Sequence, residues 1–197
     1  MSAWREAVTL SGRHVTLRPL ARSDRDAIVA ALADVGPSLA TIVPDATTVD
    51  GWYDAIDKQV AAGRALPFTV LDADGTVAGV TRFLRMNEAY ARVEIGGTVY
   101  APRVQRTGVN TEAKRLLLTH AFDILGCQCV QLRTNVLNRA SRAAIERLGA
   151  RLDGILRGHM VTPDGEVRDS AVYSIMAQEW PQVRRNLDHL LVREDRR

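Results

Sequence analysis

Apolar and polar residues alternate along seven segments of the chain, and this two-residue period is typical of half-buried strands. The segments are separated by prolines, glycines or turn-forming clusters. Two of these clusters, Asp72-Ala73-Asp74-Gly75 and Thr162-Pro163-Asp164-Gly165, have the composition of hairpin turns. The predicted strands are His14–Leu20, Leu66–Leu71, Thr76–Leu84, Ala91–Tyr100, Cys129–Val136, Arg151–Met160 and Val167–Ala177.

Five other segments carry apolar residues at helical spacing. Ser23 or Asp24 can cap the first helix, Asp50 the second and Asn138 the fourth, because such side chains accept hydrogen bonds from free backbone N–H groups. The predicted helices cover residues 24–35, 49–62, 111–125, 138–148 and 179–191.

This order of elements predicts a mixed α+β fold, with a central, mostly antiparallel, twisted seven-stranded sheet flanked by helices. One strand–helix–strand crossover lies in its middle. Gly96-Gly97 interrupts the fourth strand, so we expect a bulge or a close backbone approach there. The length of 197 residues suits a single domain over 1–197, with a charged, frayed tail at 193–197.

Charge and hydropathy narrow the possible partners. The net charge is only +3 and the arginines are scattered, so no basic face for nucleic acid is indicated. No apolar run approaches the roughly 20 residues that span a bilayer. The segment Met1–Glu6 has no apolar signal-peptide core, so we expect a cytoplasmic protein that does not engage membranes.

Cysteine and histidine spacing gives no sign of a metal site. Cys127 and Cys129 are separated by one residue, which fits neither a zinc pattern nor an easy disulfide, so both are expected to be reduced. The four histidines lie far apart in the sequence. We therefore expect no metal.

The segment Gln105–Glu112 lies between a predicted strand and a predicted helix. The first N–H groups of a helix lack intrahelical partners, and the helix dipole favours negative charge there. Arg106 adds a positive charge to this loop, and Gly108 allows a ligand to approach the backbone. The pattern fits either an ordinary turn or a cradle for phosphate.

A second motif, Asn138–Ala150, lies about thirty residues downstream of this loop. Together the two resemble the Gcn-related N-acetyltransferase (GNAT) superfamily, and Val15–Leu20 followed by Asp24 resembles its Rim-type ribosomal-protein branch. The resemblance extends over residues 13–178. Two positions depart from the family pattern: Asn110 stands where glycine or alanine is usual, and Ala150 replaces an aromatic residue.

The resemblance implies acetyl-CoA as co-substrate, bound where one parallel pair of central strands splays apart. Thr98, Val99 and Tyr100 would then offer backbone groups to the pantetheine arm. Asn138 would contact the same arm, although a simple helix cap explains this residue equally well. The pyrophosphate would be held by residues of the loop and the first helical turn, namely Arg106, Thr107, Gly108, Val109, Asn110 and Thr111.

The same resemblance suggests catalytic candidates. The tyrosine that often acts as acid in this family is replaced by Ile145. Ser141, one turn after Asn138, is then the first candidate for protonating the leaving sulfur and for contacting the cofactor, with a structural role at the helix start as the alternative. Glu94 is the candidate base, or else an ion-pair partner of Arg92 or Arg133.

Further side chains near the expected site are less specific. Tyr173 is a candidate acid or cleft residue, or plain core. His159 and Asp169 lie on opposite arms of the last predicted hairpin and can face the acceptor.

These features predict an acetyl-CoA-dependent N-acetyltransferase that acts by direct attack of a primary amine in a ternary complex. The acceptor is a protein N-terminus or a small-molecule amine. A non-catalytic acyl-CoA-binding or interaction module on the same fold is the alternative. The apolar face of the last helix can pack on the sheet or form a homodimer. Seven aspartates in residues 24–57 are either solvated helix residues or an attraction for a cationic amine.

Overall fold

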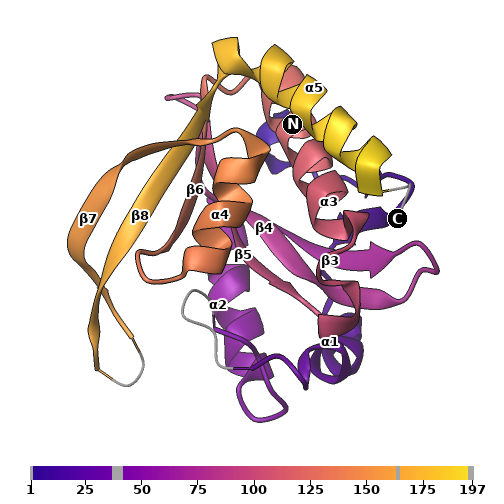
Figure 1. The fold of residues 1–197 in the computed structure, drawn as a ribbon. Helices are drawn as coiled ribbons and strands as arrows, with labels where there is room; N and C mark the ends of the chain where they lie inside the picture. Colours follow the sequence, from indigo (N-terminus) through magenta and orange to yellow (C-terminus); the bar gives the residue numbers. More distant parts are fainter. Residues whose placement is uncertain (1, 37–41, 163–164, 195–197) are drawn as a thin grey trace.

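The computed structural model describes residues 2–36, 42–162 and 165–194 and contains one eight-stranded sheet in the order β1-β2-β3-β4-β5-β6-β8-β7 (Figure 1). Among the described residues β5 and β6 form the one parallel pair, and the other neighbours are antiparallel. The strands are β1 (Leu10–Ser11), β2 (Val15–Pro19), β3 (Leu66–Asp72), β4 (Val77–Asn87), β5 (Arg92–Tyr100), β6 (Cys129–Asn135), β7 (Arg151–Val161) and β8 (Val167–Met176).

The predicted fold class is therefore confirmed, with one correction to the strand count. Leu10–Ser11 forms an additional edge strand beside β2. A segment of two residues is too short to show an alternating pattern, so it cannot be predicted from periodicity. The predicted turn at Thr162–Gly165 includes residues 163 and 164, which lie outside the described residues.

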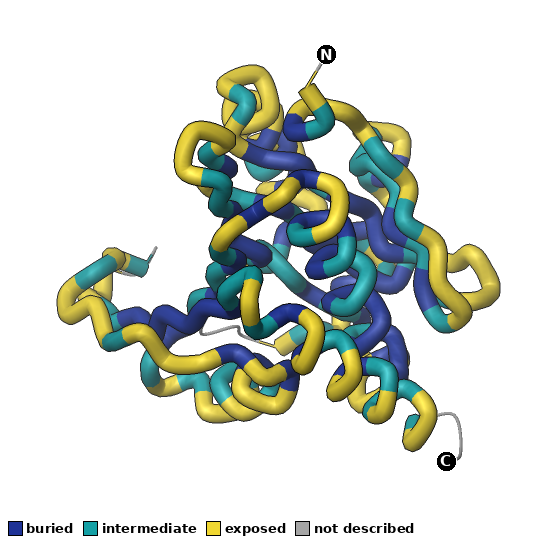
Figure 2. Tube along the Cα trace, turned by 90° about the horizontal axis from the view of Figure 1, so that it is seen from above, coloured by how far each residue is buried: buried dark blue, intermediate teal, exposed yellow. Residues whose placement is uncertain are grey.

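Helices cover both faces of the sheet and enclose two hydrophobic clusters. The larger cluster lies beneath α3, α4 and α5, and the smaller one beneath α1 and α2. Figure 2 shows the buried residues gathered between these layers. The α-helices are α1 (Arg25–Leu32), α2 (Val49–Ala61), α3 (Gly108–Thr119), α4 (Arg139–Leu148) and α5 (Trp180–Glu194).

Helix α2 starts where it was predicted, but Asp50 is not its cap. Helix α2 begins at Val49, so Asp50 lies inside it and bonds Arg25 instead of acting as the cap. The Asp45 carboxylate accepts hydrogen bonds from the amides of Thr47 and Thr48 just before this helix. The capping role thus belongs to a residue upstream of the predicted one.

Helix α3 starts earlier than predicted, at Gly108 instead of Thr111. The hydroxyl of Thr107 accepts a hydrogen bond from the amide of Val109 and caps the helix. Its far end continues as a π-helical turn over His120–Ile124. Three residues assigned to the phosphate loop therefore belong to the first helical turn.

Helix α5 packs on its own chain. Trp180, Val183 and Leu187 are buried in the larger cluster, which resolves the two alternatives given for this face in favour of intramolecular packing. The helix extends to Glu194, so residues 193 and 194 of the predicted tail are helical. The rest of the predicted tail, 195–197, lies outside the described residues.

Both cysteines are free, Cys127 buried and Cys129 half-buried. The described residues contain no cluster of three or more histidine, cysteine, aspartate or glutamate side chains placed to hold a metal ion. Within the same residues, no helix combines the length and apolarity needed to cross a bilayer.

Candidate active site

The parallel strands β5 and β6 separate halfway along their length. They pair from Arg92 opposite Cys129 to Ile95 opposite Leu132, and beyond that point each strand continues without pairing to the other. A bulge lies at the point of separation, where Arg82 of β4 pairs with Gly96. The predicted distortion at Gly96-Gly97 is thus confirmed.

The bulge has a consequence for side-chain direction. Gly97 has φ +56°, a conformation that favours glycine. Ile95 and Val99 are four residues apart and would share a face in a regular strand. They belong instead to different hydrophobic clusters on the two faces of the sheet. One inserted residue therefore turns the second half of β5 over.

The predicted phosphate loop follows β5 directly. Its Arg106 is exposed and has φ +62°, which is unusual for a residue with a side chain. The side-chain amide of Gln105 donates to the carbonyl of Tyr100 at 3.1 Å, and the hydroxyl of Thr107 donates to the carbonyl of Val104 at 2.6 Å. These bonds fix the loop so that the N-terminus of α3 follows immediately. A Cβ atom on Gly108 would lie 2.9 Å from the ring of His14, so this position has no room for a side chain.

The residues in the first turn of α3 differ in how far they are buried. Val109 is buried and Asn110 half-buried. Thr111 is fully buried, and its hydroxyl bonds Glu194 and Arg147. Its side chain is therefore held by α4 and α5 and fastens the first turn of α3 to these helices.

Asn138 caps α4 in the way the sequence predicts. Its side-chain oxygen accepts a hydrogen bond from the amide of Ser141 at 2.9 Å. Ser141 is half-buried, and its hydroxyl has no hydrogen-bond partner among the described residues. The backbone of Ser141 thus serves the helix start, while its hydroxyl stays available for other contacts.

A buried lysine, which the sequence analysis did not single out, lies under β5. Lys114 of α3 donates from Nζ to the hydroxyl of Thr98 at 2.8 Å, and Thr98 also bonds Thr81 of β4 at 2.8 Å. Burial lowers the pKa of Lys114 to about 7. Nearby, burial also raises the pKa of Tyr100, whose buried hydroxyl has no partner among the described residues.

A cleft of about 980 Å³ opens on the other face of the sheet, beside α2. It reaches the bulge, so it meets the predicted cofactor site from the acceptor side. The described residues that line it come from α2, from the central strands and from the β7–β8 hairpin, with neighbouring loop residues: Ile42, Thr48, Gly51, Trp52, Ala55, Lys58, Gln59, Ala62, Arg64, Arg82, Leu84, Arg85, Glu94, Gly96, Gly97, Arg133, Met160 and Arg168.

Glu94 lies in the wall of this cleft and is buried. Its Oε2 lies 2.8 Å from Nη1 of Arg85 and 3.2 Å from Nη2 of Arg133. Of the two ion-pair partners considered from the sequence, the pair with Arg133 is present. The other oxygen, Oε1, faces the position that a side chain on Gly96 would occupy, so glycine there leaves it open.

Arg133 also connects Glu94 to His159, which the sequence placed near the acceptor. His159 Nε2 lies 3.0 Å from Arg133 Nη1, and its Nδ1 lies 2.9 Å from the Ser170 hydroxyl. An arginine only donates, so Nε2 accepts and Nδ1 carries the proton. Burial and the nearby Arg133 lower the pKa of His159. Asp169, in contrast, accepts a hydrogen bond from the amide of Gly158 and does not line the cleft.

Tyr173 is buried in the larger cluster and does not line the cleft. Its hydroxyl donates to Glu146 at 2.7 Å and accepts from Nε of Arg142 at 2.9 Å. Both partners belong to α4, so this tyrosine fastens that helix to β8. This is the core position that the sequence left as an alternative to a role as acid.

The aspartates of the first helices do not line the cleft. Asp54 and Asp57 pair with Arg22, and Asp26 and Asp50 pair with Arg25. Asp24 is buried against Arg18. Their charges are thus largely compensated by arginines on the same side of the molecule.

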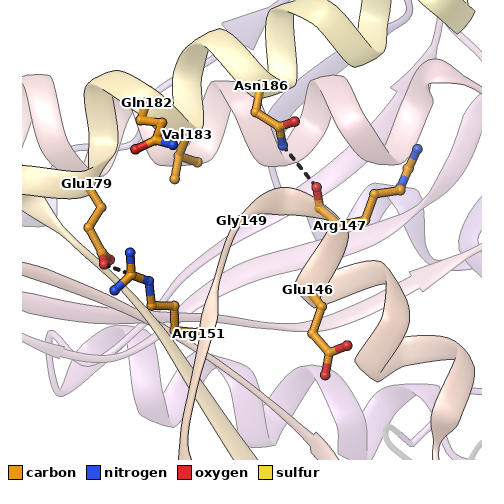
Figure 3. A pocket seen from close by; sticks show the side chains of 8 residues that line it. All are labelled: Glu146, Arg147, Gly149, Arg151, Glu179, Gln182, Val183 and Asn186. Carbon is orange, nitrogen blue, oxygen red and sulfur yellow. Dashed lines mark hydrogen bonds and ion pairs between the residues drawn. The ribbon is translucent and has the colours of Figure 1, made fainter.

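A second, smaller pocket of about 320 Å³ lies between the end of α4, the start of β7 and α5 (Figure 3). Arg151 and Glu179 form an ion pair at its side, with nitrogen and oxygen 3.1 Å apart. None of the predicted site residues lines this pocket.

Comparison with known proteins identifies the family. Residues 14–151 match the acetyltransferase (GNAT) domain family, and the chain belongs to this family. Over 107 residues it is 31% identical to "Putative ribosomal N-acetyltransferase YdaF" of Bacillus subtilis (strain 168), a match that spans 54% of this chain and 57% of that protein.

Two solved structures extend the similarity over nearly the whole chain. A GCN5-related N-acetyltransferase from Brucella melitensis has a TM-score of 0.82 and 32% identity, covering 94% of this chain and 86% of that one. RimJ of Mycobacterium smegmatis, in complex with CoA-disulfide, has a TM-score of 0.78 and 25% identity, covering 96% of this chain and 97% of that one. The family and the Rim-type resemblance predicted from the sequence are confirmed.

Proposed function

We propose that this GNAT acetyltransferase uses acetyl-CoA to acetylate a primary amine by direct attack in a ternary complex. The observation that carries the proposal is the separation of β5 from β6 after Ile95 and Leu132, with an anion-binding geometry at the end of β5 and an open cleft on the far face. A thioester bound between the strands would meet an amine arriving through the cleft.

The residues present fit the cofactor. The loop after β5 leads directly into the N-terminus of α3, whose first N–H groups favour an anion, and the exposed Arg106 adds a positive charge. The glycine at position 108 lets the ring of His14 pack against this turn. The backbone of Thr98–Tyr100 and the cap residue Asn138 border the separated strands. When bound, acetyl-CoA supplies an acetyl group activated as a thioester.

The protein's own contribution at the acceptor side is to orient a neutral amine. Glu94 is proposed to accept a hydrogen bond from this amine, directly or through water, with Oε1, because Oε2 is held by Arg85 and Arg133. The same two arginines disfavour a further positive charge nearby, so they shift the amine towards the neutral form that can act as nucleophile.

Proton delivery to the departing thiolate is proposed for Ser141. Its hydroxyl is without a partner in the described protein and lies in the first turn of α4, next to the cap residue Asn138. Tyr173 is proposed to position α4 and not to react, since its hydroxyl is engaged by Arg142 and Glu146.

The acceptor is a protein N-terminus or a small-molecule amine. A ribosomal acceptor would place the activity in the cytoplasm, and the name "Putative ribosomal N-acetyltransferase" is given to the relative YdaF. We include a homodimer in the proposal because the edge strand β7 exposes apolar side chains, and such edges are prone to pair. These side chains are Leu152, Ile155, Leu156, Met160 and Val161.

Calorimetric titration of acetyl-CoA tests the proposal. Wild type should bind in a saturable way, and Arg106→Gly should bind more weakly because the loop loses its positive charge. The substitution relieves a left-handed backbone at φ +62°, so the fold should be kept. Ala91→Gly is the matched control, since Ala91 has φ +46° at the opposite end of β5 and should bind as wild type does.

Two outcomes would contradict the proposal. Without saturable binding by wild type, the loop is only a turn. Binding without turnover of any primary amine would favour the non-catalytic acyl-CoA-binding module, which the buried Ile145 at the position of the usual tyrosine also favours.

A further inference from the structure

The acceptor cleft is strongly cationic. Among the described residues that line it, one is a carboxylate, Glu94, and six are cationic: Lys58, Arg64, Arg82, Arg85, Arg133 and Arg168. Arg82 and Arg85 on β4 and Arg133 on β6 lie in the inner part of the cleft. Among the described residues that line the cleft, Glu94 is the one acidic side chain beside them. This leaves a formal surplus of two positive charges beside the point where the central strands separate.

Arg82 has no anionic partner among the described residues. Its side chain is half-buried, its Nε is fully buried, and it forms no hydrogen bond or ion pair there. Gly97 makes room for it, since a Cβ atom on Gly97 would lie 2.4 Å from the Arg82 Nε. A partly buried cation without a counter-charge is costly for a fold, so it points to a counter-charge supplied from outside.

Arg85 is aimed into the cleft by an unusual backbone. It has φ +47° in an irregular stretch of β4, where the register against β5 shifts between Leu84 and Asn87. Residues with a side chain rarely adopt this conformation, and such strain is concentrated at functional sites. In this conformation the guanidinium reaches Glu94 at 2.8 Å while its side chain remains 48% exposed to the cleft.

We propose that the acceptor is an amine with a carboxylate on the same residue or on one of the next two residues, and that Arg82 and Arg85 bind this carboxylate. The proposal deepens the N-acetyltransferase function above and rests on it. Two sources share this chemistry: a peptide N-terminus followed by acidic residues, and a free acidic amino acid. A polyamine is disfavoured because the cleft would repel its cationic chain.

Neighbouring aspartates do not compensate the positive charge of the cleft. Asp54 and Asp57, on the helix that borders the cleft, both bond Arg22, and neither lines the cleft. Their charges therefore cannot compensate Arg82 and Arg85 from inside the cleft.

The test measures binding of acceptor probes to the full chain loaded with CoA. Three fluorescent peptides differ only at their second and third positions, as Ser-Glu-Glu, Ser-Gln-Gln and Ser-Lys-Lys, and anisotropy gives their Kd values. Free glutamate and spermidine compete against the bound peptide. We expect the acidic peptide to bind at least about tenfold more tightly than the basic one, with a preference that shrinks at high salt.

Variants assign the preference to particular residues. Arg85→Gln and Arg82→Gln should each reduce acidic-peptide binding by about tenfold, and Arg82→Lys should restore part of it. Arg85 is exposed enough to replace safely if Arg82→Gln does not fold. Arg151→Gln removes the same charge at the other pocket, where Arg151 is 79% exposed, and should have no effect.

Each outcome decides the proposal. Equal or weaker binding of the acidic peptide, no binding of any acidic probe, or an equal loss in Arg151→Gln would overturn it. If free glutamate displaces the bound acidic peptide, the acceptor is a small molecule. If the acidic peptide binds and free glutamate does not displace it, the acceptor is a peptide. Acetyl-CoA titration of the same samples separates the two hypotheses, since its failure contradicts the transferase function and not the charge preference.

Discussion

The guanidinium of Arg82 lies against Gly97 so closely that a Cβ atom there would approach its Nε to 2.4 Å. One glycine thus serves the bulge that separates the central strands and also the position of a cleft arginine. If Arg82 binds the acceptor as proposed, backbone shape and acceptor recognition are coupled at this residue.

Replacing this glycine should damage both functions. Gly97→Ala adds a side chain at φ +56° and displaces Arg82, so we expect the free energy of unfolding to fall by about 1 kcal/mol or more and acidic-acceptor binding to weaken. Gly75→Ala is the matched control, because Gly75 has φ +77° and no heavy atom within 4 Å of the added Cβ. It should lose a similar stability in urea and keep binding. Equal binding losses in the two variants would contradict the coupling.

Lys114 should make stability depend on pH. Because burial lowers its pKa to about 7, the unfolded chain binds more protons than the folded one from about pH 7 to its ordinary pKa near 10.4. The penalty for folding with this lysine is therefore full below pH 7 and fades as the pH rises. Urea unfolding of Lys114→Met should show greater stability than wild type at pH 7, with an advantage that shrinks by at most about 1.4 kcal/mol per pH unit towards pH 10. The exposed Lys58→Met should show no such trend.

Tyr173→Phe should show whether this tyrosine stabilises the fold or acts as the catalytic acid. Loss of the hydroxyl removes hydrogen bonds to Glu146 and Arg142, so we expect a loss of about 1–2 kcal/mol in stability, with kcat within about twofold of wild type. Urea unfolding and steady-state kinetics measure the two effects. A drop in kcat of about 10²-fold, with acetyl-CoA binding kept, would instead assign the tyrosine as the acid.

Ser141→Ala should reduce kcat by up to about 10²-fold and leave the Kd for acetyl-CoA unchanged. Alanine keeps the backbone N–H that Asn138 caps, so α4 should remain intact. Asn138→Ala is the complementary variant, expected to lose about 1 kcal/mol of stability with the cap and to weaken acetyl-CoA binding. Full activity of Ser141→Ala would remove the serine from the proton-transfer step.

Local patterns predict much of the site's backbone. The distortion at Gly96-Gly97 and the cap at Asn138 depend on neighbouring residues alone, and both are present. The start of α3 differs from the prediction because Thr107, which caps the helix, lies in a segment that also has the composition of a loop. Such an error of three residues is enough to move backbone amides from a loop into a helix.

The acceptor cleft was not predictable in the same way. The cleft brings together Arg82 and Arg85 of β4 and Arg133 of β6, two strands that are far apart in the sequence. In addition, the alternation of apolar and polar residues does not tell which face of a sheet borders a cleft. The aspartates of the first helices suggested the opposite charge, because their pairing with Arg22 and Arg25 depends on tertiary contacts. Lys114, on a predicted amphipathic helix, gave no sign that it would be buried against Thr98.

Glu194 accepts a hydrogen bond from Thr111 across 83 positions of the chain, and another from Arg147. The first turn of the cofactor helix is therefore fastened by residues made much later in synthesis. At roughly 5–20 residues per second, about 4–17 s pass between the translation of the two ends of this contact. A nascent chain thus lacks this contact for several seconds, and in the proposed function its phosphate-binding turn is complete only after α5 has emerged and packed.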